Sequence, residues 1–179
     1  IQKWKEILEG DVTKLWNFIK MKIKMRTQSV QEKNWNITKE GKVLKQYKKK
    51  WICDPIINNI RNPNVHIIKR MRIGNSILRS HYGQGNSKLC TNCDENVPQT
   101  NDHYLFECTK FKSQRINLLK NVEKEMNYLN TSVSAKSLLG YYPEIFRSKR
   151  KIKKYKNSIE NVLKIVMKYI EDTNRFNRR

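Results

Sequence analysis

Three cysteines and one histidine are the residues in this sequence best suited to chemistry. Cys90, Cys93, His103 and Cys108 form the pattern C-x2-C-x9-H-x4-C within 19 residues. Thiolate sulfur and imidazole nitrogen suit tetrahedral zinc, and structural zinc sites use four such ligands. Four protein ligands leave no open position for a reacting water, so the pattern predicts a structural Zn²⁺ site and not a catalytic one.

Two alternatives for the cysteines stay open. They are small residues buried without a metal, or they form a redox dithiol. The dithiol is disfavoured because no strand followed by a helix places Cys90 at a helix start. His81 is the spare ligand if His103 does not serve. Otherwise His81 and His66 are expected to pack or to lie at the surface, and Cys53 to be a small core residue.

Catalytic patterns are absent from the sequence. It contains no H-E-x-x-H, no G-x-S-x-G, no Walker loop and no carboxylate cluster of the two-metal type. The zinc-deaminase pattern needs P-C-x-x-C with an upstream H-x-E, but Leu89 precedes Cys90 and no such histidine is present. We therefore expect no catalytic residue and no small-molecule substrate.

Basic residues are the second feature with functional meaning. Lys and Arg number 38 against 16 Asp and Glu, for a formal charge of +22, which predicts RNA and/or DNA as a partner. Codon bias towards A and T enriches Lys, Asn and Ile, but it does not cluster the lysines. Here they cluster at residues 20–26, 42–50, 69–72 and 147–156. The last cluster has seven basic residues in ten and no acid, so it predicts a phosphate partner.

Phosphate contacts are expected just ahead of the cysteines and in the last basic cluster. Tyr47, Trp51 and Tyr155 lie in or beside basic clusters, where rings can stack on unpaired bases. Packing in a core is the favoured role for Trp16, Trp35 and Trp51. The predicted nucleic-acid contacts are Lys69, Arg70, Arg72, Arg79, Arg147, Lys149, Arg150, Lys151, Lys153, Lys154 and Lys156.

The elements that must position these residues are predicted to be helices. Gly (6) and Pro (4) are few, and apolar residues recur at helical spacing. We expect a helix over residues 1–9 ended by Gly10, and another from Asp11 to residues 31–35. Further helices are expected at 65–73, 76–82, 102–107, 109–128 and 134–139, with a last one running to about residue 170. In the helix at 65–73, Asn64 is the expected cap, and Lys69, Arg70 and Arg72 are expected to face outward.

These elements predict a mainly α fold, an irregular helical assembly around a small CCHC zinc knuckle-like loop. Residues 1–61 form an N-terminal helical segment, 62–115 the basic helix and zinc motif, and 116–179 a C-terminal helical segment, expected together as one compact unit. The sequence has no run of 18 apolar residues, so no membrane span is predicted. The cysteines with metal spacing indicate a reducing compartment, the nucleus and/or the cytoplasm. The start at Ile1 indicates a piece of a longer protein.

One ordered set of motifs points to a family. R-M-R-I-G-N-S-I-L at residues 70–78 precedes the cysteine and histidine series, followed by Phe111 and Arg115. From about residue 35 to 115 this resembles the C-terminal region of non-LTR (LINE-like) retrotransposon reverse-transcriptase polyproteins, where R-x-R-x-G-H-x-x-L precedes a CCHC zinc motif. Asn75 replaces the family's usual His and Ile73 its Thr. Asp94 stands where Gly is common after the second cysteine, and Asp tolerates a left-handed backbone.

The resemblance implies the non-catalytic tail of such a polyprotein. In that family the tail helps to bind template RNA or target DNA during target-primed reverse transcription. The family's polymerase, endonuclease and ribonuclease H residues have no counterpart here. A zinc-stapled module that docks on the rest of the polyprotein is the alternative, and exposed hydrophobic area would favour it. A third hypothesis is an enzyme whose catalytic residues lie elsewhere in the parent chain.

Overall fold

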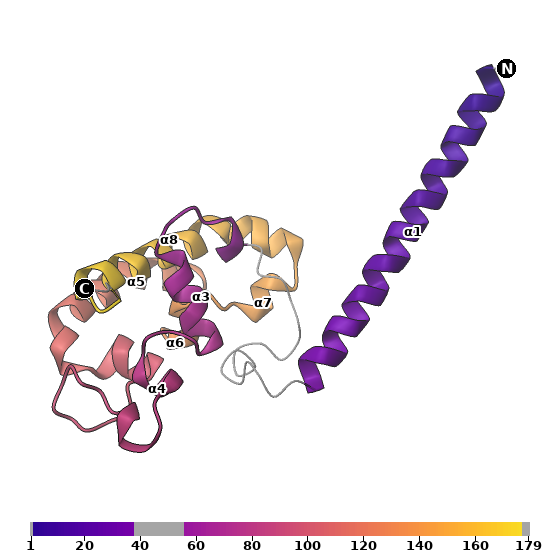
Figure 1. The fold of residues 1–179 in the computed structure, drawn as a ribbon. Coiled ribbons are helices and arrows are strands. Elements are labelled where there is room, and N and C mark those ends of the chain that lie inside the picture. Colours follow the sequence, from indigo (N-terminus) through magenta and orange to yellow (C-terminus); the bar gives the residue numbers. More distant parts are fainter. Residues whose placement is uncertain (1, 38–55, 177–179) are drawn as a thin grey trace. The chain divides into compact units, whose positions relative to one another are not determined.

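The computed structural model describes residues 2–37 and 56–176 and is mainly helical there, without a strand in either range (Figure 1). The predicted fold class, a helical assembly around the cysteine and histidine site, is confirmed. The chain separates into two units, residues 1–40 and 41–179. The division into three sequence segments stays a prediction, and Trp51, Cys53 and the basic cluster at 42–50 lie outside the described residues.

The first unit contains one long helix, α1 (Gln2–Ile37). The expected break at Gly10 is wrong, because the helix continues through it. One glycine costs a helix only about 1 kcal/mol relative to alanine. Trp16 was expected to pack in a core but is 55% exposed, with the Lys20 Nζ atom 5.2 Å from its ring centroid. Leu15 and Phe18 are also exposed, so α1 carries apolar side chains on its surface.

The second unit is built on two paired helices, α5 (Lys112–Tyr128) and α8 (Lys149–Thr173). Both bury residues at helical spacing, which confirms their predicted periodicity: Leu118, Val122 and Met126 from α5, and Ile159, Val162, Leu163, Val166 and Ile170 from α8. The 3-10 turn η4 (Thr109–Phe111) leads into α5. Among the described residues, no helix is long and apolar enough to cross a bilayer.

Two short helices connect α5 to α8. The helix α6 (Ala135–Leu138) begins with a capping box, in which the Ser134 and Ser137 side chains bond each other's backbone N–H. Gly140 follows with φ 81°, and a Cβ there would lie 2.9 Å from a Leu163 methyl carbon, so the turn requires glycine. The helix α7 (Pro143–Phe146) then leads into α8.

The segment before the cysteines begins with the 3-10 turn η1 (Ile57–Asn59), followed by α3 (Val65–Ile73) and α4 (Arg79–Tyr82). Gly74 ends α3 in the left-handed conformation, as expected of a helix C-terminus. The expected cap at Asn64 does not form: its side chain makes no capping hydrogen bond, and its Nδ2 donates to Glu171 Oε1 at 2.6 Å. The helix expected at 76–82 is only one turn long.

One predicted orientation in α3 is wrong. Arg72 was expected to face outward as a phosphate contact, but its side chain is only 4% exposed. It follows Ile68 by four residues, so both lie on the same face of the helix, and that face is buried. Arg70 is exposed and Lys69 half-buried, so these two stay in the predicted contact set and Arg72 leaves it.

Candidate metal centre

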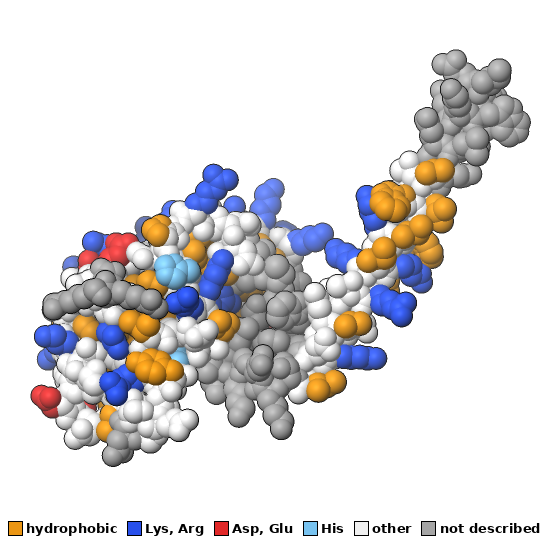
Figure 2. Space-filling model, viewed as in Figure 1, with side chains coloured by type: hydrophobic (Ala, Val, Ile, Leu, Met, Phe, Trp, Pro, Cys, Tyr) orange, Lys and Arg blue, Asp and Glu red, His pale blue; other side chains and the backbone are white. Residues whose placement is uncertain are grey.

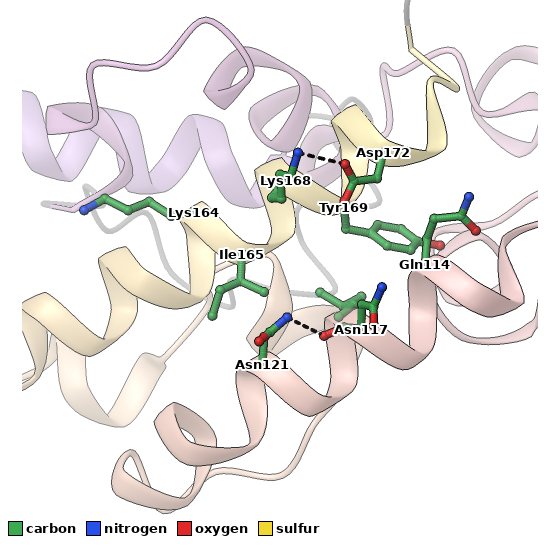
Figure 3. Close-up of a pocket in the computed structure, with 9 residues that line it drawn as sticks. Gln114, Asn117, Asn121, Lys164, Ile165, Lys168, Tyr169 and Asp172 are labelled. Carbon is green, nitrogen blue, oxygen red and sulfur yellow. Dashed lines mark hydrogen bonds and ion pairs between the residues drawn. The ribbon is translucent and has the colours of Figure 1, made fainter.

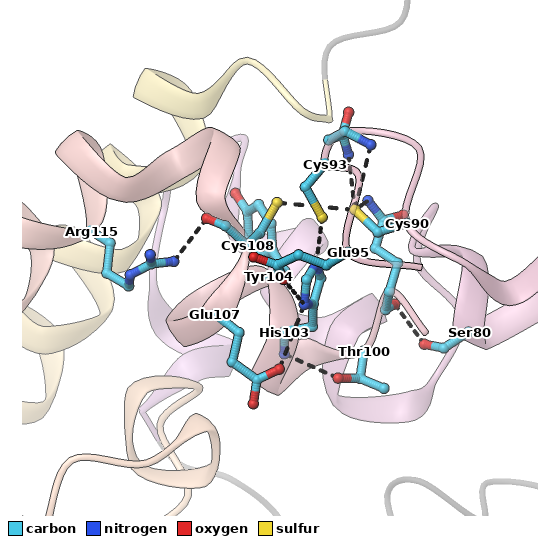
Figure 4. A network of polar contacts seen from close by, with 12 residues as sticks. Ser80, Cys90, Cys93, Glu95, Thr100, His103, Tyr104, Glu107, Cys108 and Arg115 are labelled. Carbon is cyan, nitrogen blue, oxygen red and sulfur yellow. Dashed lines mark hydrogen bonds and ion pairs between the residues drawn. The ribbon is translucent and has the colours of Figure 1, made fainter. Parts of the chain in front are cut away.

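Four ligand atoms converge at one point of the second unit (Figure 4). The Sγ atoms of Cys90, Cys93 and Cys108 and a ring nitrogen of His103 all lie within 4.8 Å of one another. Cys90 Sγ lies 3.9 Å from Cys108 Sγ, and Cys93 Sγ lies 3.4 Å from His103 Nε2. Zinc–sulfur bonds of about 2.3 Å in a tetrahedron separate two sulfurs by about 3.8 Å. The four predicted ligands therefore fit one small tetrahedral ion.

The first two cysteines lie in a tight loop closed by antiparallel backbone pairing. The Cys90 N–H donates to the Val97 carbonyl at 2.8 Å, and Leu89 pairs with Pro98. Inside the loop, the Asn92 N–H points to Cys90 Sγ at 3.4 Å. The left-handed residue of the loop is Asn96, with φ 53°, so the left-handed backbone considered for Asp94 is not found there. Asparagine tolerates this conformation well.

The last two ligands lie at the ends of one turn of π-helix, η3 (His103–Glu107). The Cys108 N–H donates to the His103 carbonyl at 2.7 Å, a bond from residue i+5 to residue i. In an α-helix, residues five apart differ by about 140° around the axis. The wider turn brings His103 and Cys108 to the same side of the helix. The short helix expected at 102–107 must place them so if both side chains are to bind one ion. Arg115 holds the end of this turn by donating to the Cys108 carbonyl at 3.0 Å.

The second nitrogen of the His103 ring faces carboxylates. Its Nδ1 lies 3.5 Å from Glu107 Oε2 and 4.0 Å from Glu95 Oε2. A carboxylate beside Nδ1 favours a proton there, which leaves the Nε2 lone pair free for a metal. His103 is only 1% exposed, so its ring is enclosed with Nε2 towards the cysteines and Nδ1 towards the two carboxylates.

Gln99 is a functional residue that the sequence did not indicate. It is 1% exposed, and its Nε2 donates to Cys90 Sγ at 3.5 Å. Its Oε1 accepts from the Arg79 N–H at 3.1 Å and from Arg175 at 2.9 Å. Gln99 thus connects the metal site to α4 and to the residues after α8. Glutamine is not one of the ligand types in the C-x2-C-x9-H-x4-C pattern, so the pattern does not reveal the role of Gln99.

The candidate metal site is fastened to helices distant in sequence. The Asn101 Nδ2 donates to the Met71 carbonyl at 3.1 Å, which ties the site to α3. The Tyr169 hydroxyl of α8 donates to the Tyr104 carbonyl at 2.7 Å, and the Tyr104 hydroxyl contacts Thr173 Oγ1 at 2.6 Å. Because Tyr104 lies between two ligands, these bonds couple the metal site to the α5–α8 pair.

The spare ligand His81 is not part of the site. Its Nδ1 lies 2.8 Å from Ser76 Oγ, and burial lowers the pKa of the ring. His66 is exposed and contacts the Pro63 carbonyl. His81 thus packs locally and His66 lies at the surface, as the sequence predicts for histidines that are not ligands.

The cysteine thiols differ in acidity. Burial acts to raise the pKa of Cys90, but hydrogen bonds from the Asn92 N–H, His103 and Cys93 outweigh it and lower the pKa to about 7. Burial, together with the neighbouring Cys90 thiolate, raises the pKa of Cys108 to about 12. In the metal-free chain at neutral pH, Cys108 therefore retains its proton, which a metal must displace.

We expect metal affinity to increase with pH. Displacing one proton makes the apparent affinity rise about tenfold per pH unit. Cys108 contributes this dependence across pH 6–8, and Cys90 adds to it below its pKa of about 7. Competition with a chelator of known pH dependence measures the slope. An affinity that does not change between pH 6 and 8 contradicts binding through these thiolates.

The structure also places the predicted phosphate contacts. On α8, Lys149, Arg150, Lys151, Lys153 and Lys154 are exposed over the first turns. Other members of the predicted set have protein partners: Arg79 Nε donates to the Ser87 carbonyl at 2.6 Å, Arg147 pairs with Glu144 at 2.9 Å, and Lys156 lies 3.7 Å from Glu160.

No protein family model, curated protein or solved structure matches the chain. The resemblance to the retrotransposon polyproteins therefore stays a prediction.

Proposed function

We propose that the chain is a zinc-stabilised nucleic-acid-binding module that performs no chemistry itself. In this proposal Zn²⁺ is held by Cys90, Cys93, His103 and Cys108. Three thiolates and one imidazole favour zinc over the hard cations magnesium and calcium, which prefer oxygen ligands. With four protein ligands, the metal's role is to fix the fold and not to activate water.

The observation that carries the proposal is the charge at the start of α8. The first turn of this helix contains no acid, and Lys149, Arg150 and Lys151 are exposed there. A helix N-terminus already has a partial positive charge of about +0.5, so basic side chains at this end repel it and one another. A polyanion removes this repulsion, and phosphate groups offer the matching charge and acceptor oxygens.

The basic character extends over the second unit. On the face of this unit shown in Figure 2, Lys and Arg side chains project over much of the surface, whereas the Asp and Glu side chains visible there lie towards its left edge. On α3, Arg70 is exposed and Lys69 half-buried, ahead of the metal site. The metal site thus supports a framework that presents basic side chains from at least two helices.

The sequence resemblance adds a biological setting to this chemistry. If the chain is the tail of a LINE-like reverse-transcriptase polyprotein, its ligand is template RNA or target DNA. The same setting places the activity in other parts of the parent protein. The exposed lysines and arginines favour a polyanionic ligand with or without this setting.

Titration of labelled single-stranded RNA and duplex DNA at two salt concentrations tests the proposal. With about six phosphate contacts, affinity is expected to fall on the order of a thousandfold between 50 and 200 mM salt. Fluorescence anisotropy on the zinc-loaded chain measures it. A flat salt response contradicts the phosphate contacts, and a zinc-loaded chain that binds neither nucleic acid favours the second candidate.

That second candidate is a protein-interaction module, and α1 is the observation that favours it. Val12, Leu15, Trp16, Ile19 and Ile23 share one face of this helix and are between 37% and 63% exposed. Lys20, Lys22 and Lys24 accompany them. An amphipathic acidic segment of the parent polyprotein would match this surface in both apolar contact and charge.

A further inference from the structure

A cavity of about 360 Å³ lies beside the basic start of α8. It is bounded by the residues after α5, by α7 and by the first turns of α8, and Tyr141, Lys151 and Tyr155 are among its lining residues. This volume is within the range of small-ligand sites in proteins. The cavity therefore has room for a planar ring system next to the proposed phosphate contacts.

The aromatic side chains at this cavity are arranged as a support for another ring. Tyr155 is half-buried, and the exposed Tyr128 packs against it with ring centroids 5.5 Å apart at 68°. The Lys154 Nζ lies 4.9 Å from the Tyr155 ring centroid. Tyrosine rings beside ammonium groups are the combination that binds single-stranded nucleic acid, by base stacking and by phosphate contact.

The charge around the cavity is positive. Lys151 lines it, and the Lys154 Nζ lies over the ring of Tyr155, which also lines it. The one acid that lines it, Glu144, is paired with Arg147 at 2.9 Å. An entering base would therefore bring its phosphates to the ammonium groups of Lys151 and Lys154 and not to an unpaired carboxylate.

A second cleft in this unit is less suited to a nucleotide than the cavity beside α8. The cleft between α5 and α8 in Figure 3 has a volume of about 240 Å³. Its Lys168 pairs with Asp172 at 2.9 Å, and its Asn121 Nδ2 donates to the Asn117 carbonyl at 2.8 Å. Lys168 and Asn121 thus already have partners within the cleft, and among its described lining residues only Tyr169 is aromatic, so it offers less to a nucleotide.

We propose that the cavity beside α8 accepts an unpaired base of single-stranded nucleic acid. The base lies against Tyr155, which Tyr128 supports edge-on, and Lys151 and Lys154 contact the flanking phosphates. This inference rests on the proposed function and names its preferred ligand. Bases in a duplex are stacked inside the helix and cannot enter, so single strands bind more tightly than a duplex of the same sequence.

Replacing the tyrosines tests this ligand preference. Tyr155→Leu is expected to weaken binding of a single-stranded oligonucleotide about tenfold, since stacking is lost, and to leave duplex binding unchanged. Tyr155→Phe retains the ring and the affinity. Because Tyr155 contacts the core, the exposed partner is replaced as well, and Tyr128→Leu is expected to lower single-strand affinity several-fold. Tyr82→Leu, at an exposed tyrosine of α4, is the matched control.

Anisotropy of labelled single strand and duplex gives the affinities, and a 2-aminopurine base reports stacking by its fluorescence quenching. Circular dichroism confirms that each variant folds. Folded leucine variants that bind single strands as tightly as the wild type, or that lose both ligands equally, overturn the base-binding cavity while the phosphate contacts stand. A wild-type chain that binds neither ligand overturns the cavity and the proposed function together.

Discussion

Replacing Cys93 by serine is expected to remove the metal and to unfold much of the second unit. A serine hydroxyl is not ionised at neutral pH, so only three effective ligands remain. Structural zinc contributes about 10–16 kcal/mol of apparent binding energy in zinc-finger peptides, against a total stability of about 5–15 kcal/mol for a typical domain. Metal content should fall from one per chain to near zero, and thermal unfolding followed by circular dichroism should shift to much lower temperature.

Cys53 provides the control for this experiment. It is the fourth cysteine of the chain and does not belong to the metal pattern. Cys53→Ser is therefore expected to retain one metal per chain. If Cys93→Ser melts at the wild-type temperature, the four side chains do not stabilise the fold through a metal.

Removing charge from the start of α8 should have the second large effect. In the quadruple change of Lys149, Arg150, Lys153 and Lys154 to Gln, four exposed basic groups disappear. Each phosphate contact contributes about 0.9 to the slope of log affinity against log salt on duplex DNA, so the slope should fall by about 3–4. Affinity at 50 mM salt should fall roughly a hundredfold or more, on every sequence alike, because phosphates are the same throughout.

A matched control removes the same charge from another part of the second unit. Lys110, Lys112, Lys120 and Lys124 are exposed on and just before α5, and their replacement by Gln should lower the affinity much less. Equal losses in the two variants would show that net charge alone attracts the ligand. In that case α8 is not the contact surface.

The cluster of three cysteines and one histidine was predictable because its information is local. Ligand type and spacing within 19 residues fixed the four partners, and the structure brings their ligand atoms within 4.8 Å of one another. The helices α5 and α8 were predictable for a similar reason, since each repeats its buried residues at helical spacing.

The features that sequence reasoning missed depend on contacts between distant segments. Arg72 carries a charge, which predicts an exposed side chain, but it shares a helix face with Ile68 and that face is covered in the folded unit. Trp16 looks like a core residue by type, yet α1 leaves it exposed. Gln99 acts through Arg175, 76 positions away, which only the folded chain brings near.

The tyrosines at the cavity illustrate the same limit. The sequence places Tyr155 in the basic cluster, but its partner Tyr128 is on a different helix. The π-helical turn at His103 was also missed, although a short helix was expected there. Its Cys108 end is held by Arg115 from α5, a contact that appears only in the folded chain.

X-ray absorption at the zinc edge of the purified chain tests the central claim most directly. The predicted spectrum comes from one zinc per chain with three sulfurs at about 2.3 Å and one nitrogen at about 2.0 Å. A folded chain without metal, or a zinc shell of nitrogen and oxygen alone, would contradict a metal centre formed by Cys90, Cys93, His103 and Cys108.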